Sequence, residues 1–547
     1  MITIKLGNNQ IQAQPGTKIL DLMPDAMERG VLGCVCNNAL TELTDAVYED
    51  CEIKPIDING RQGHMIYQRS AALLMMYAAK NVFGAKADVD VRHSVNKNLS
   101  CAISGLDAGT DMQTITEKIE SAMLRAVEDD LPIVREVMSI RRARAILSVS
   151  GDEVTLNTLR YRRAGFVSMY KMGDDWACLY GPVVPSAGYL RDFKLIPERN
   201  GFILRLPNPV SAKPLSDVTS LIKIRGVYEE SSAWSKVMGV EYVGALNNAI
   251  CNRQGGNIIR VNEALHEKRI AAIADTIHAQ GKHIVLIAGP SSSGKTTFAH
   301  RLAVQIRVLG LEPHVISLDN YFNDAKDVPL DELGKPDFEN FKHVNCEQLN
   351  IDLVRLLKGE TVELPTYNFQ RGIREYRGDT LKLGSKGVLI LEGIHALNEA
   401  LVYQVPSVEM FKVFISAMTQ INLDRHNRIP TSDTRLLRRI VRDMRTRATD
   451  AVRTMAMWEN VARGEEKNIF PWQENADVMF NSALVYEMCV MKQYVEPLLF
   501  NIADDDPSKP DAVRLLGYLD SFVSLPPDEV PKGSILREFI GGSIYYS

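Results

Sequence analysis

The stretch that most constrains this chain is residues 283–297, which read HIVLIAGPSSSGKTT. Its first half is a continuous aliphatic run, typical of a parallel strand that is buried on both faces. Its second half, residues 289–296, fits the pattern G-x-x-x-x-G-K-[ST] without a mismatch. Apolar residues with helical spacing follow to residue 306. A strand, a glycine-rich loop and a helix in this order predict a phosphate-binding loop in an α/β fold with a parallel sheet.

The residues of this loop have distinct expected roles. Glycines at its two ends let backbone N–H groups turn toward phosphate oxygens, and the helix N-terminus adds the positive end of its dipole. Lys295 is placed to reach the β- and γ-phosphates, and the Thr296 hydroxyl to hold Mg²⁺. A turn that binds nothing is the alternative, and the complete motif disfavours it. The predicted ATP-binding residues of the loop are Gly289, Ser291, Ser292, Ser293, Gly294, Lys295, Thr296 and Thr297.

Length and composition indicate the broad class of protein to which this chain belongs. The 547 residues predict about three or four domains. The formal net charge of −5 argues against a protein that mainly coats nucleic acid. We expect a cytoplasmic protein without a membrane partner, because no apolar run is long enough to span a bilayer and residues 1–6 lack a signal-peptide pattern. Eight cysteines in so long a chain indicate reduced thiols and no disulfide framework.

Residues 1–60 carry the pattern of a small separate domain. Residues 2–6 alternate like a strand, residues 7–10 form a turn, and residues 18–29 have helical spacing. This order resembles the TGS domain, which occurs in threonyl-tRNA synthetases, some GTPases and alarmone synthetases. The resemblance implies a β-grasp fold and contact with RNA or a regulatory role. A purely structural appendage is an equal alternative.

Residues 61–205 resemble the α+β editing domain that follows TGS in threonyl-tRNA synthetases. Residues 69–74, RSAALL, match H-S-x-x-H-L, and residues 180–186 with 193–195 match C-R-G-P-H-V-P and F-K-L. Cys178 lies one place away from a ligand position. We therefore expect the fold without zinc and without hydrolysis of mischarged tRNA, while contact with RNA through residues 1–205 stays open. The positions of the metal ligands in this family are occupied by Arg69, Leu73, Leu179 and Val183.

Residues 206–262 form an expected connector. A long helix with Asn262 as its N-cap should then lead into the strand before the loop. His266 on this helix is interpreted as a polar residue of the helix surface, since a lone histidine carries little information. Residues 506–547 are too apolar for a disordered end, so we expect this tail to pack on the body or on a partner subunit of a homo-oligomer.

A second strand, residues 313–318, ends at Asp319. A carboxylate at this end of a parallel sheet lies in the ligand crevice, where it can accept a hydroxyl proton or help hold Mg²⁺. Spacing alone leaves a simple helix cap equally possible. The surrounding motifs SLDNYF (317–322), PDFEN (336–340), LPTYNF (364–369) and LEGI (391–394) together resemble the uridine kinase and phosphoribulokinase family. This resemblance places a P-loop kinase domain at residues 263–505, and the whole chain resembles bacterial TGS-containing nucleoside kinases.

The resemblance implies a role for each motif. Asp319 would be the general base for the acceptor hydroxyl, and Glu392 a carboxylate near Mg²⁺, with Thr296 and Asp319 as the other metal-site residues. Asp337 and Glu339 would contact the sugar hydroxyls of the acceptor, and Tyr367 and Phe369 would line its pocket.

Four arginines follow in one helical stripe. Their spacing of i, i+3, i+4 and i+7 places them on one helix face. Such a density of guanidinium groups suits phosphate, and the alternative is a solvated basic face paired with Asp433 and Asp443. By resemblance they belong to a lid over the triphosphate, with Arg438 and Arg442 as catalytic residues beside Lys295. The four are Arg435, Arg438, Arg439 and Arg442.

The predicted function is an ATP- and Mg²⁺-dependent nucleoside kinase of the uridine kinase type. Uridine and cytidine kinases often place a histidine soon after the P-x-Y-D-F segment, whereas Arg371 follows here, which suits a polar or phosphorylated acceptor. Two alternatives remain: a sugar or sugar-phosphate kinase of the phosphoribulokinase type, and a noncatalytic, nucleotide-sensing RNA-binding regulator. A GTPase is disfavoured because no N-K-x-D motif follows Thr296.

Overall fold

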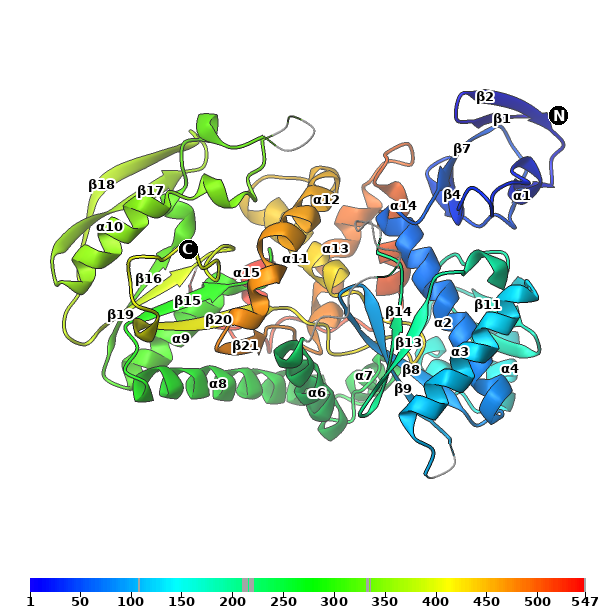
Figure 1. Cartoon of the computed structure of the whole chain (residues 1–547), viewed down its shortest axis with the longest axis horizontal. Coiled ribbons are helices and arrows are strands. Elements are labelled where there is room, and N and C mark those ends of the chain that lie inside the picture. Colours follow the sequence, from blue (N-terminus) through cyan, green and yellow to red (C-terminus); the bar gives the residue numbers. More distant parts are fainter. Residues whose placement is uncertain (107–108, 209–214, 216–220, 331–333, 335, 546–547) are drawn as a thin grey trace.

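The computed structural model describes residues 1–106, 109–208, 215, 221–330, 334 and 336–545. Figure 1 shows a parallel sheet with its helices on the left, and the elements of residues 1–205 on the right. None of the described helices combines the length and the apolar character needed to cross a bilayer.

The first 56 residues form a five-stranded sheet in the order β2-β1-β7-β4-β5. The expected helix over residues 18–29 shrinks to one turn, α1 (Ile19–Leu22), and the chain continues in turns to residue 30. A short pair, β3 (Thr17–Lys18) and β6 (Ala46–Val47), closes the edge next to α1. The five strands are β1 (Ile2–Leu6), β2 (Asn9–Ala13), β4 (Gly33–Cys36), β5 (Ala39–Thr41) and β7 (Cys51–Ile56).

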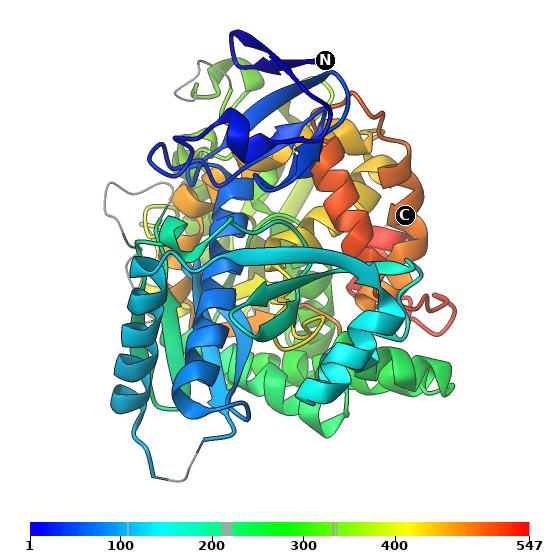
Figure 2. The ribbon, with the colours of Figure 1, turned by 90° about the vertical axis from the view of Figure 1, so that its right-hand side faces the viewer.

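Residues 61–205 pack two long helices on an antiparallel sheet of order β13-β14-β9-β8 (Figure 2). The helices are α2 (Arg61–Phe83) and α3 (Met112–Glu128). The strands are β8 (Asp88–Val95), β9 (Asn98–Ser104), β13 (Lys194–Glu198) and β14 (Gly201–Arg205). A second sheet with two helices contains β10 (Ile133–Ser139), β11 (Phe166–Met172), β12 (Asp175–Cys178), α4 (Ile140–Ser150) and α5 (Glu153–Leu159).

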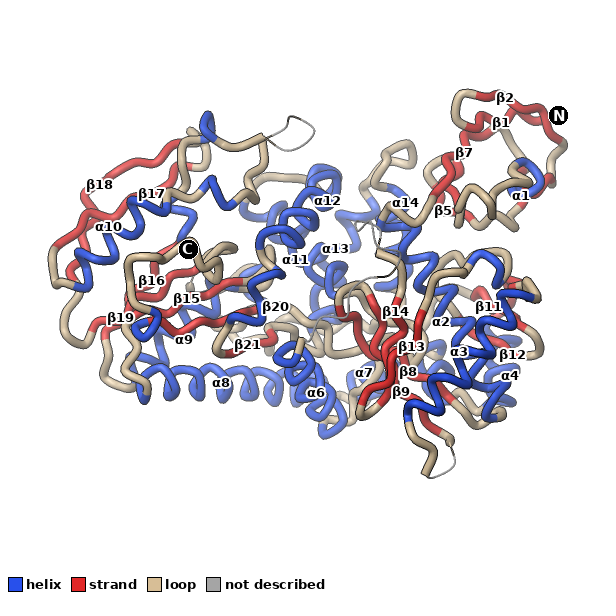
Figure 3. The backbone as a smooth tube through the Cα atoms, viewed as in Figure 1, coloured by secondary structure: helices blue, strands red, loops and turns tan. Residues whose placement is uncertain are grey.

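Three helices connect these sheets to the rest of the chain: α6 (Ile222–Val237), α7 (Val243–Cys251) and α8 (Gly255–Ala279). The expected start of the long helix at Asn262 is wrong, because α8 begins seven residues earlier and Asn262 lies buried within it, accepting a hydrogen bond from Val485 N at 3.0 Å. The expected boundary at residue 262 therefore falls inside one continuous helix, which runs along the lower edge of Figure 3. Residues 209–214 and 216–220 of the expected connector lie outside the described residues.

The predicted parallel sheet is confirmed. Its order is β16-β19-β15-β20-β21, and every neighbouring pair is parallel. Alternate residues of the central strand β15 enter two different apolar clusters, so both of its faces are buried. Helices α8 and α9 cover one face, and α10 covers the other. The strands are β15 (Ile284–Ala288), β16 (Glu312–Ser317), β19 (Gly387–Glu392), β20 (Met410–Ser416) and β21 (Val478–Asn481).

The remaining elements surround the carboxyl ends of these strands. A hairpin of β17 (Thr361–Asn368) and β18 (Ile373–Lys382) extends beyond the sheet (Figure 1). The last helix, α15 (Leu536–Ile540), packs against α11 and α13, which agrees with the expectation that the apolar tail packs on the body. The helices are α9 (Lys295–Val308), α10 (Cys346–Leu357), α11 (Thr431–Thr446), α12 (Ala451–Asn468), α13 (Glu487–Phe500) and α14 (Lys509–Leu519).

The two halves of the chain meet on the segment between β20 and α11. Val91 N donates to Arg425 O at 2.8 Å, and the Thr158 hydroxyl donates to Leu423 O at 2.8 Å. Arg61 at the start of α2 forms an ion pair with Asp433 in the first turn of α11. The N-terminal half thus holds the segment that leads into the arginine-bearing helix.

Candidate active site

The loop between β15 and α9 is tightly curled. Gly294 has φ +85°, and Gly289 packs so closely that an added Cβ would lie 2.0 Å from Ile415 O. Both positions therefore require glycine. The hydroxyls of Ser292 and Ser293 are buried and have no hydrogen-bond partner among the described residues. Unused buried donors at a helix N-terminus fit an anionic ligand such as the phosphates of ATP.

Lys295 and Thr296 lie at the mouth of this loop. Lys295 Nζ donates to Gly289 O at 3.0 Å and to Pro290 O at 3.3 Å, so the ammonium lies across the loop. The Thr296 hydroxyl donates to Glu392 Oε1 at 3.2 Å. The loop therefore places an ammonium group and a hydroxyl–carboxylate pair beside each other, as a phosphate and a hard metal ion require.

The two predicted carboxylates come from neighbouring strands. Ser317 at the end of β16 is in register with Glu392 at the end of β19, and Asp319 follows two residues later. Burial raises the pKa of Asp319, against the opposing charges of Lys295, Arg447 and Arg442. Burial, followed by the charge of Asp319, raises the pKa of Glu392 to about 7. Glu392 is buried and Asp319 is partly exposed. Two neighbouring carboxyl groups that repel each other fit a divalent cation, because Mg²⁺ would relieve the repulsion.

In the arginine stripe of α11, Arg435, Arg438 and Arg439 are buried and Arg442 is partly exposed, so the alternative of a solvated basic face is wrong. Arg435 donates to Ser291 O at 3.1 Å, and its guanidinium is paired with both oxygens of Glu465. Arg439 Nη1 donates to the Ser291 hydroxyl at 2.8 Å. The expected pairing with Asp443 also exists, at 3.2 Å from Arg439. Helix α11 is therefore held directly against the phosphate-binding loop.

Arg438 differs from its neighbours. Its side chain is 0% exposed and pairs with Glu487, while Nη2 donates to Ser482 O at 2.9 Å. Its guanidinium carbon also lies 5.0 Å from the ring centre of Phe539. These contacts anchor α11, and Arg438 Nη1 also donates to Ser292 O of the loop at 3.4 Å. The catalytic role that the resemblance implies for Arg438 stays a prediction.

Arg442 and Arg447 face the other side of the site. Arg442 donates to Asp443 Oδ1 at 2.8 Å, and the charges of both arginines lower the pKa of Asp319 against burial. Arg447 was missed because it is the cap residue that ends α11, five positions after Arg442 and outside the four-residue stripe. The next turn of the stripe falls at residues 445 and 446, so its spacing did not point to Arg447.

The predicted acceptor residues divide into two groups. Glu339 is half-buried, and desolvation together with the charge of Glu465 raises its pKa to about 7. The charge of Lys295 opposes this shift, and the charge of Asp319 adds to it. The Tyr367 ring contacts the ring of Phe322 edge-on, with centroids 5.7 Å apart. Both residues are therefore brought toward the site.

The second group makes contacts outside the expected acceptor pocket. It contains Asp337, Phe369 and Arg371. Asp337 accepts from Glu339 N at 3.2 Å, which shapes its own loop. Phe369 contacts Tyr367 edge-on but is 68% exposed. Arg371 donates to Glu375 at 3.0 Å across the hairpin, so it does not face the acceptor region as expected. The histidine missing after Phe369 has a counterpart in His343, which is buried and stacks on Phe322 at 4.4 Å.

The C-terminal segment reaches the loop from more than two hundred residues away. Glu538 Oε2 accepts from the Thr297 hydroxyl at 2.6 Å and from Thr297 N at 3.4 Å. The Ile535 side chain packs so closely on Gly294 that an added Cβ would lie 2.5 Å from it. Arg445 of α11 donates to Phe539 O at 3.1 Å. One segment thus contacts both the loop and the helix that covers it.

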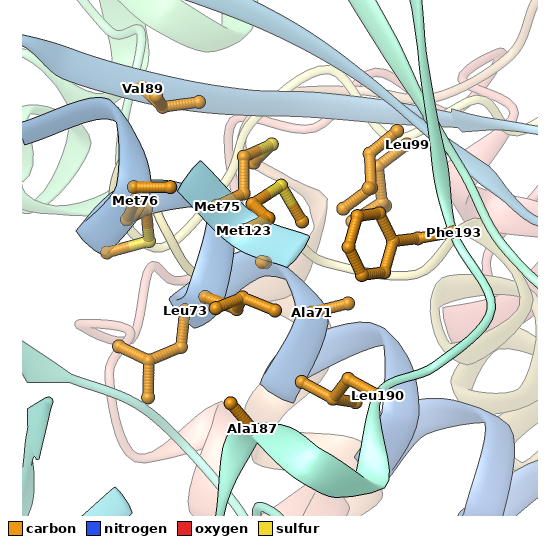
Figure 4. Close-up of a cluster of buried hydrophobic side chains, with 14 of the residues drawn as sticks. Ala71, Leu73, Met75, Met76, Val89, Leu99, Met123, Ala187, Leu190 and Phe193 are labelled. Carbon is orange, nitrogen blue, oxygen red and sulfur yellow. The ribbon is translucent and has the colours of Figure 1, made fainter. Parts of the chain in front are cut away.

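A second cluster of buried charges lies where the editing resemblance placed metal ligands. Arg69 donates to Pro182 O at 2.7 Å, and burial lowers its pKa to about 10. Glu42 reaches in from the N-terminal sheet and accepts from Tyr170 at 2.6 Å and from Val183 N at 3.2 Å. Leu73 belongs to the apolar core around α2 (Figure 4). Glu42 also forms an ion pair with Arg135 at 3.6 Å, so the charged groups of this cluster have partners within the protein.

The two halves of the chain are similar to two different groups of known proteins. Residues 284–487 match the model of the "Phosphoribulokinase / Uridine kinase family". The uridine kinase of Halobacterium salinarum is 29% identical over 35% of this chain and 77% of its own length, and that of Lactobacillus helveticus is 31% identical over 30% and 69%.

The threonine–tRNA ligase of Syntrophotalea carbinolica is 30% identical over 29% of this chain, which spans only 25% of that ligase. The solved structure titled "Structure of a Possible Uridine Kinase from Bacillus stearothermophilus" covers 39% of this chain and 98% of its own, with 20% identity and a TM-score of 0.27, too low to support a conclusion. The family match and the two kinase relatives agree with the loop, the parallel sheet and the carboxylates described above. Through residues 284–487, this chain belongs to the phosphoribulokinase / uridine kinase family.

Proposed function

We propose that this chain is an ATP- and Mg²⁺-dependent kinase that transfers the γ-phosphoryl group to the primary hydroxyl of a nucleoside. The observation that carries the proposal is Asp319, which follows β16 and interacts electrostatically with Lys295 of the phosphate-binding loop. A carboxylate in this place can accept the proton of an acceptor hydroxyl as the phosphoryl group moves.

The residues around Asp319 would supply positioning and charge. Backbone N–H groups of the loop and Lys295 orient the phosphates, and Arg442 and Arg447 bring positive charge to the side of Asp319. Thr296, Glu392 and Asp319 would hold Mg²⁺, which neutralises charge on the phosphate oxygens when bound. The raised pKa values of Glu392 and Glu339 are those of a poorly solvated region, where electrostatic interactions are stronger than in water.

The acceptor side favours a nucleoside. Tyr367, Phe322 and His343 form an aromatic wall that suits a planar base, with Phe322 and His343 stacked at 4.4 Å. The Glu339 carboxyl suits sugar hydroxyls. Arg371 is paired with Glu375, so the cation that suited a phosphorylated acceptor is already engaged. This engagement favours an acceptor without a phosphate.

The test is ADP release from ATP·Mg²⁺ with ribonucleosides, ribose sugars and sugar phosphates offered as acceptors. We expect one nucleoside to stimulate turnover and to appear as its 5′-monophosphate by mass spectrometry. Asp319→Asn should lower the rate by about 10²–10⁴-fold. The matched control is Asp327→Asn in the same segment, where the side chain is exposed and the rate should stay unchanged.

Other outcomes decide against the proposal. Stimulation by a sugar phosphate alone would assign phosphoribulokinase-type activity. No stimulation by any acceptor, together with tight ATP binding, would assign a nucleotide sensor. An Asp319→Asn enzyme of normal rate would remove Asp319 from the mechanism.

A further inference from the structure

A cavity of about 470 Å³ lies on the edge of the parallel sheet, away from the phosphate-binding loop. Helix α6 and helix α8 form its sides, and strand β21 forms its base. It shares no residue with the loop or with the carboxylates Asp319 and Glu392. Its volume is within the range of small-molecule sites in proteins.

His266 lines this cavity, and the expectation that it lies on the helix surface is wrong. Its side chain is 3% exposed, and neither ring nitrogen has a hydrogen-bond partner among the described residues. Burial, followed by the charge of Arg301, lowers the pKa of His266 to about 3, with the adjacent Ala483 backbone opposing the shift. The ring is therefore neutral at physiological pH and presents one donor and one acceptor.

An unpaired imidazole in an apolar wall costs folding free energy. The nearest aromatic neighbour, Phe480, contacts the His266 ring edge-on at 5.1 Å and offers it no hydrogen bond. The polar groups of Asn481, which also lines the cavity, are already used: Nδ2 donates to Ser231 Oγ at 3.1 Å and to Met418 O at 2.8 Å. Among the described residues that line the cavity, His266 is the one whose buried side-chain atoms lack a hydrogen-bond partner.

The walls define the shape and charge of an occupant. Trp234 and Met479 line the cavity and offer flat or polarisable surfaces, which suit an aromatic ring. The two charged residues on the facing helices, Arg269 and Glu230, form an ion pair with each other. This pair is compensated, and the third charged lining residue, Asp477, accepts a hydrogen bond from Lys412 N at 2.7 Å, so the lining disfavours an anionic ligand.

We propose that this cavity binds a neutral, flat heteroaromatic molecule that forms one hydrogen bond to a ring nitrogen of His266, through its N–H group or its own ring nitrogen. The ring of the ligand lies against Trp234 and Met479. The site does not depend on the activity proposed above, and its ligand does not compete with ATP.

The probe for this site is 7-azaindole, which is neutral and carries an N–H donor next to a ring nitrogen. Indene, of the same shape without nitrogen, is the matched control ligand. Binding to the full chain is measured by saturation-transfer NMR in the presence of Mg²⁺ and a saturating non-hydrolysable ATP analogue, which blocks the nucleotide site. We expect 7-azaindole to bind at least tenfold more tightly than indene.

Three variants decide the assignment. His266→Phe keeps a flat ring and should abolish the preference for 7-azaindole, whereas His278→Phe, exposed near the end of the same helix, should leave it intact. Ala272→Trp fills the cavity from an exposed position, so it should prevent binding even if His266→Phe fails to fold. Equal binding of the two ligands, or unchanged 7-azaindole binding in Ala272→Trp, would overturn the proposal.

Discussion

Two clusters of buried charges in this chain resemble each other in composition and differ in how their charges are paired. At the phosphate-binding loop, the Ser292 and Ser293 hydroxyls have no partner within the described structure, and Lys295 has only loop carbonyls. In the N-terminal half, Glu42 accepts hydrogen bonds from Tyr170 and Val183 N and forms an ion pair with Arg135 at 3.6 Å.

The difference separates a site that receives a ligand from a site that joins parts of a protein. A cluster with unused donors gains free energy when an anion arrives, because the donors are already desolvated and oriented. A cluster whose charges are paired has nothing left to offer a ligand, and removing one member leaves its partner buried and unpaired. We therefore expect mutations in the first cluster to change rate and mutations in the second to change stability.

The largest expected effect is on rate, at Lys295. Lys295→Ala removes the ammonium that reaches the phosphates, and kcat/KM should fall by about 10³-fold, which equals about 4 kcal/mol. The melting temperature should change little, since this side chain contacts only two loop carbonyls. Lys386→Ala, exposed before β19, is the control and should behave like the parent. A normal kcat/KM in Lys295→Ala would contradict the assignment of the loop cluster as the ligand site.

Glu42 tests the other cluster. Glu42→Ala leaves Tyr170 and Arg135 without their buried carboxylate, so the free energy of unfolding should fall by about 3 kcal/mol while kcat stays within about twofold. Urea denaturation with a parallel rate assay measures both. Glu49→Ala, exposed on the same domain, should change neither. Loss of rate without loss of stability in Glu42→Ala would show that this cluster also serves catalysis.

The protonation of Glu392 predicts how stability and Mg²⁺ affinity at the loop site depend on pH. Its folded pKa of about 7 lies above the value of 4.5 for an exposed glutamate. Glu392 therefore contributes stability that is fully present below pH 4.5 and is lost as the pH rises through 7. Affinity for Mg²⁺ should follow the opposite course and rise about tenfold per pH unit below 7, because only the ionised carboxylate binds the metal.

Both trends are read as differences between the parent and Glu392→Gln. Thermal melts without metal at pH 5 and pH 8 give the first, and Mg²⁺ titrations of ADP release give the second. If stability and Mg²⁺ affinity depend on pH equally in the parent and in Glu392→Gln, another group titrates in this range. Glu339, whose pKa is also about 7, is then the candidate.

The smallest expected effect is at Glu538. Glu538→Ala removes the acceptor of the Thr297 hydroxyl and N–H group, which should cost about 1 kcal/mol, or about fivefold in kcat/KM. Asp528→Ala, exposed earlier in the same segment, is the control. An unchanged KM for ATP together with an unchanged kcat would show that the segment stabilises the loop without affecting its function.

Local patterns predicted the central part of the molecule. The loop, the strand before it and the positions of Asp319 and Glu392 follow from motifs a few residues long, in which the backbone itself fixes the geometry. The parallel sheet followed from the continuous apolar character of β15. The arginine stripe was found because 3.6-residue periodicity is visible within one helix.

Contacts between residues that lie far apart in the sequence could not be predicted from it. Glu465 is 30 residues from Arg435, and Glu538 is 241 residues from Thr297, so no spacing links them. The error at His266 has the same cause: a helix that other elements cover on several sides has no polar face to reveal in its sequence. Arg371 was assigned to the acceptor because its partner Glu375 lies across a hairpin turn that the sequence does not fix.

The contact of Ile535 and Glu538 with the loop sets an order of events during synthesis. A ribosome adds about 5–20 residues per second, so the 241 residues between Thr297 and Glu538 take roughly 10–50 s to translate. Throughout this interval the nascent chain carries the loop without the segment that packs on Gly294 and caps Thr297. The packing of Ile535 on Gly294 and the hydrogen bond of Glu538 to Thr297 can therefore form only after this interval.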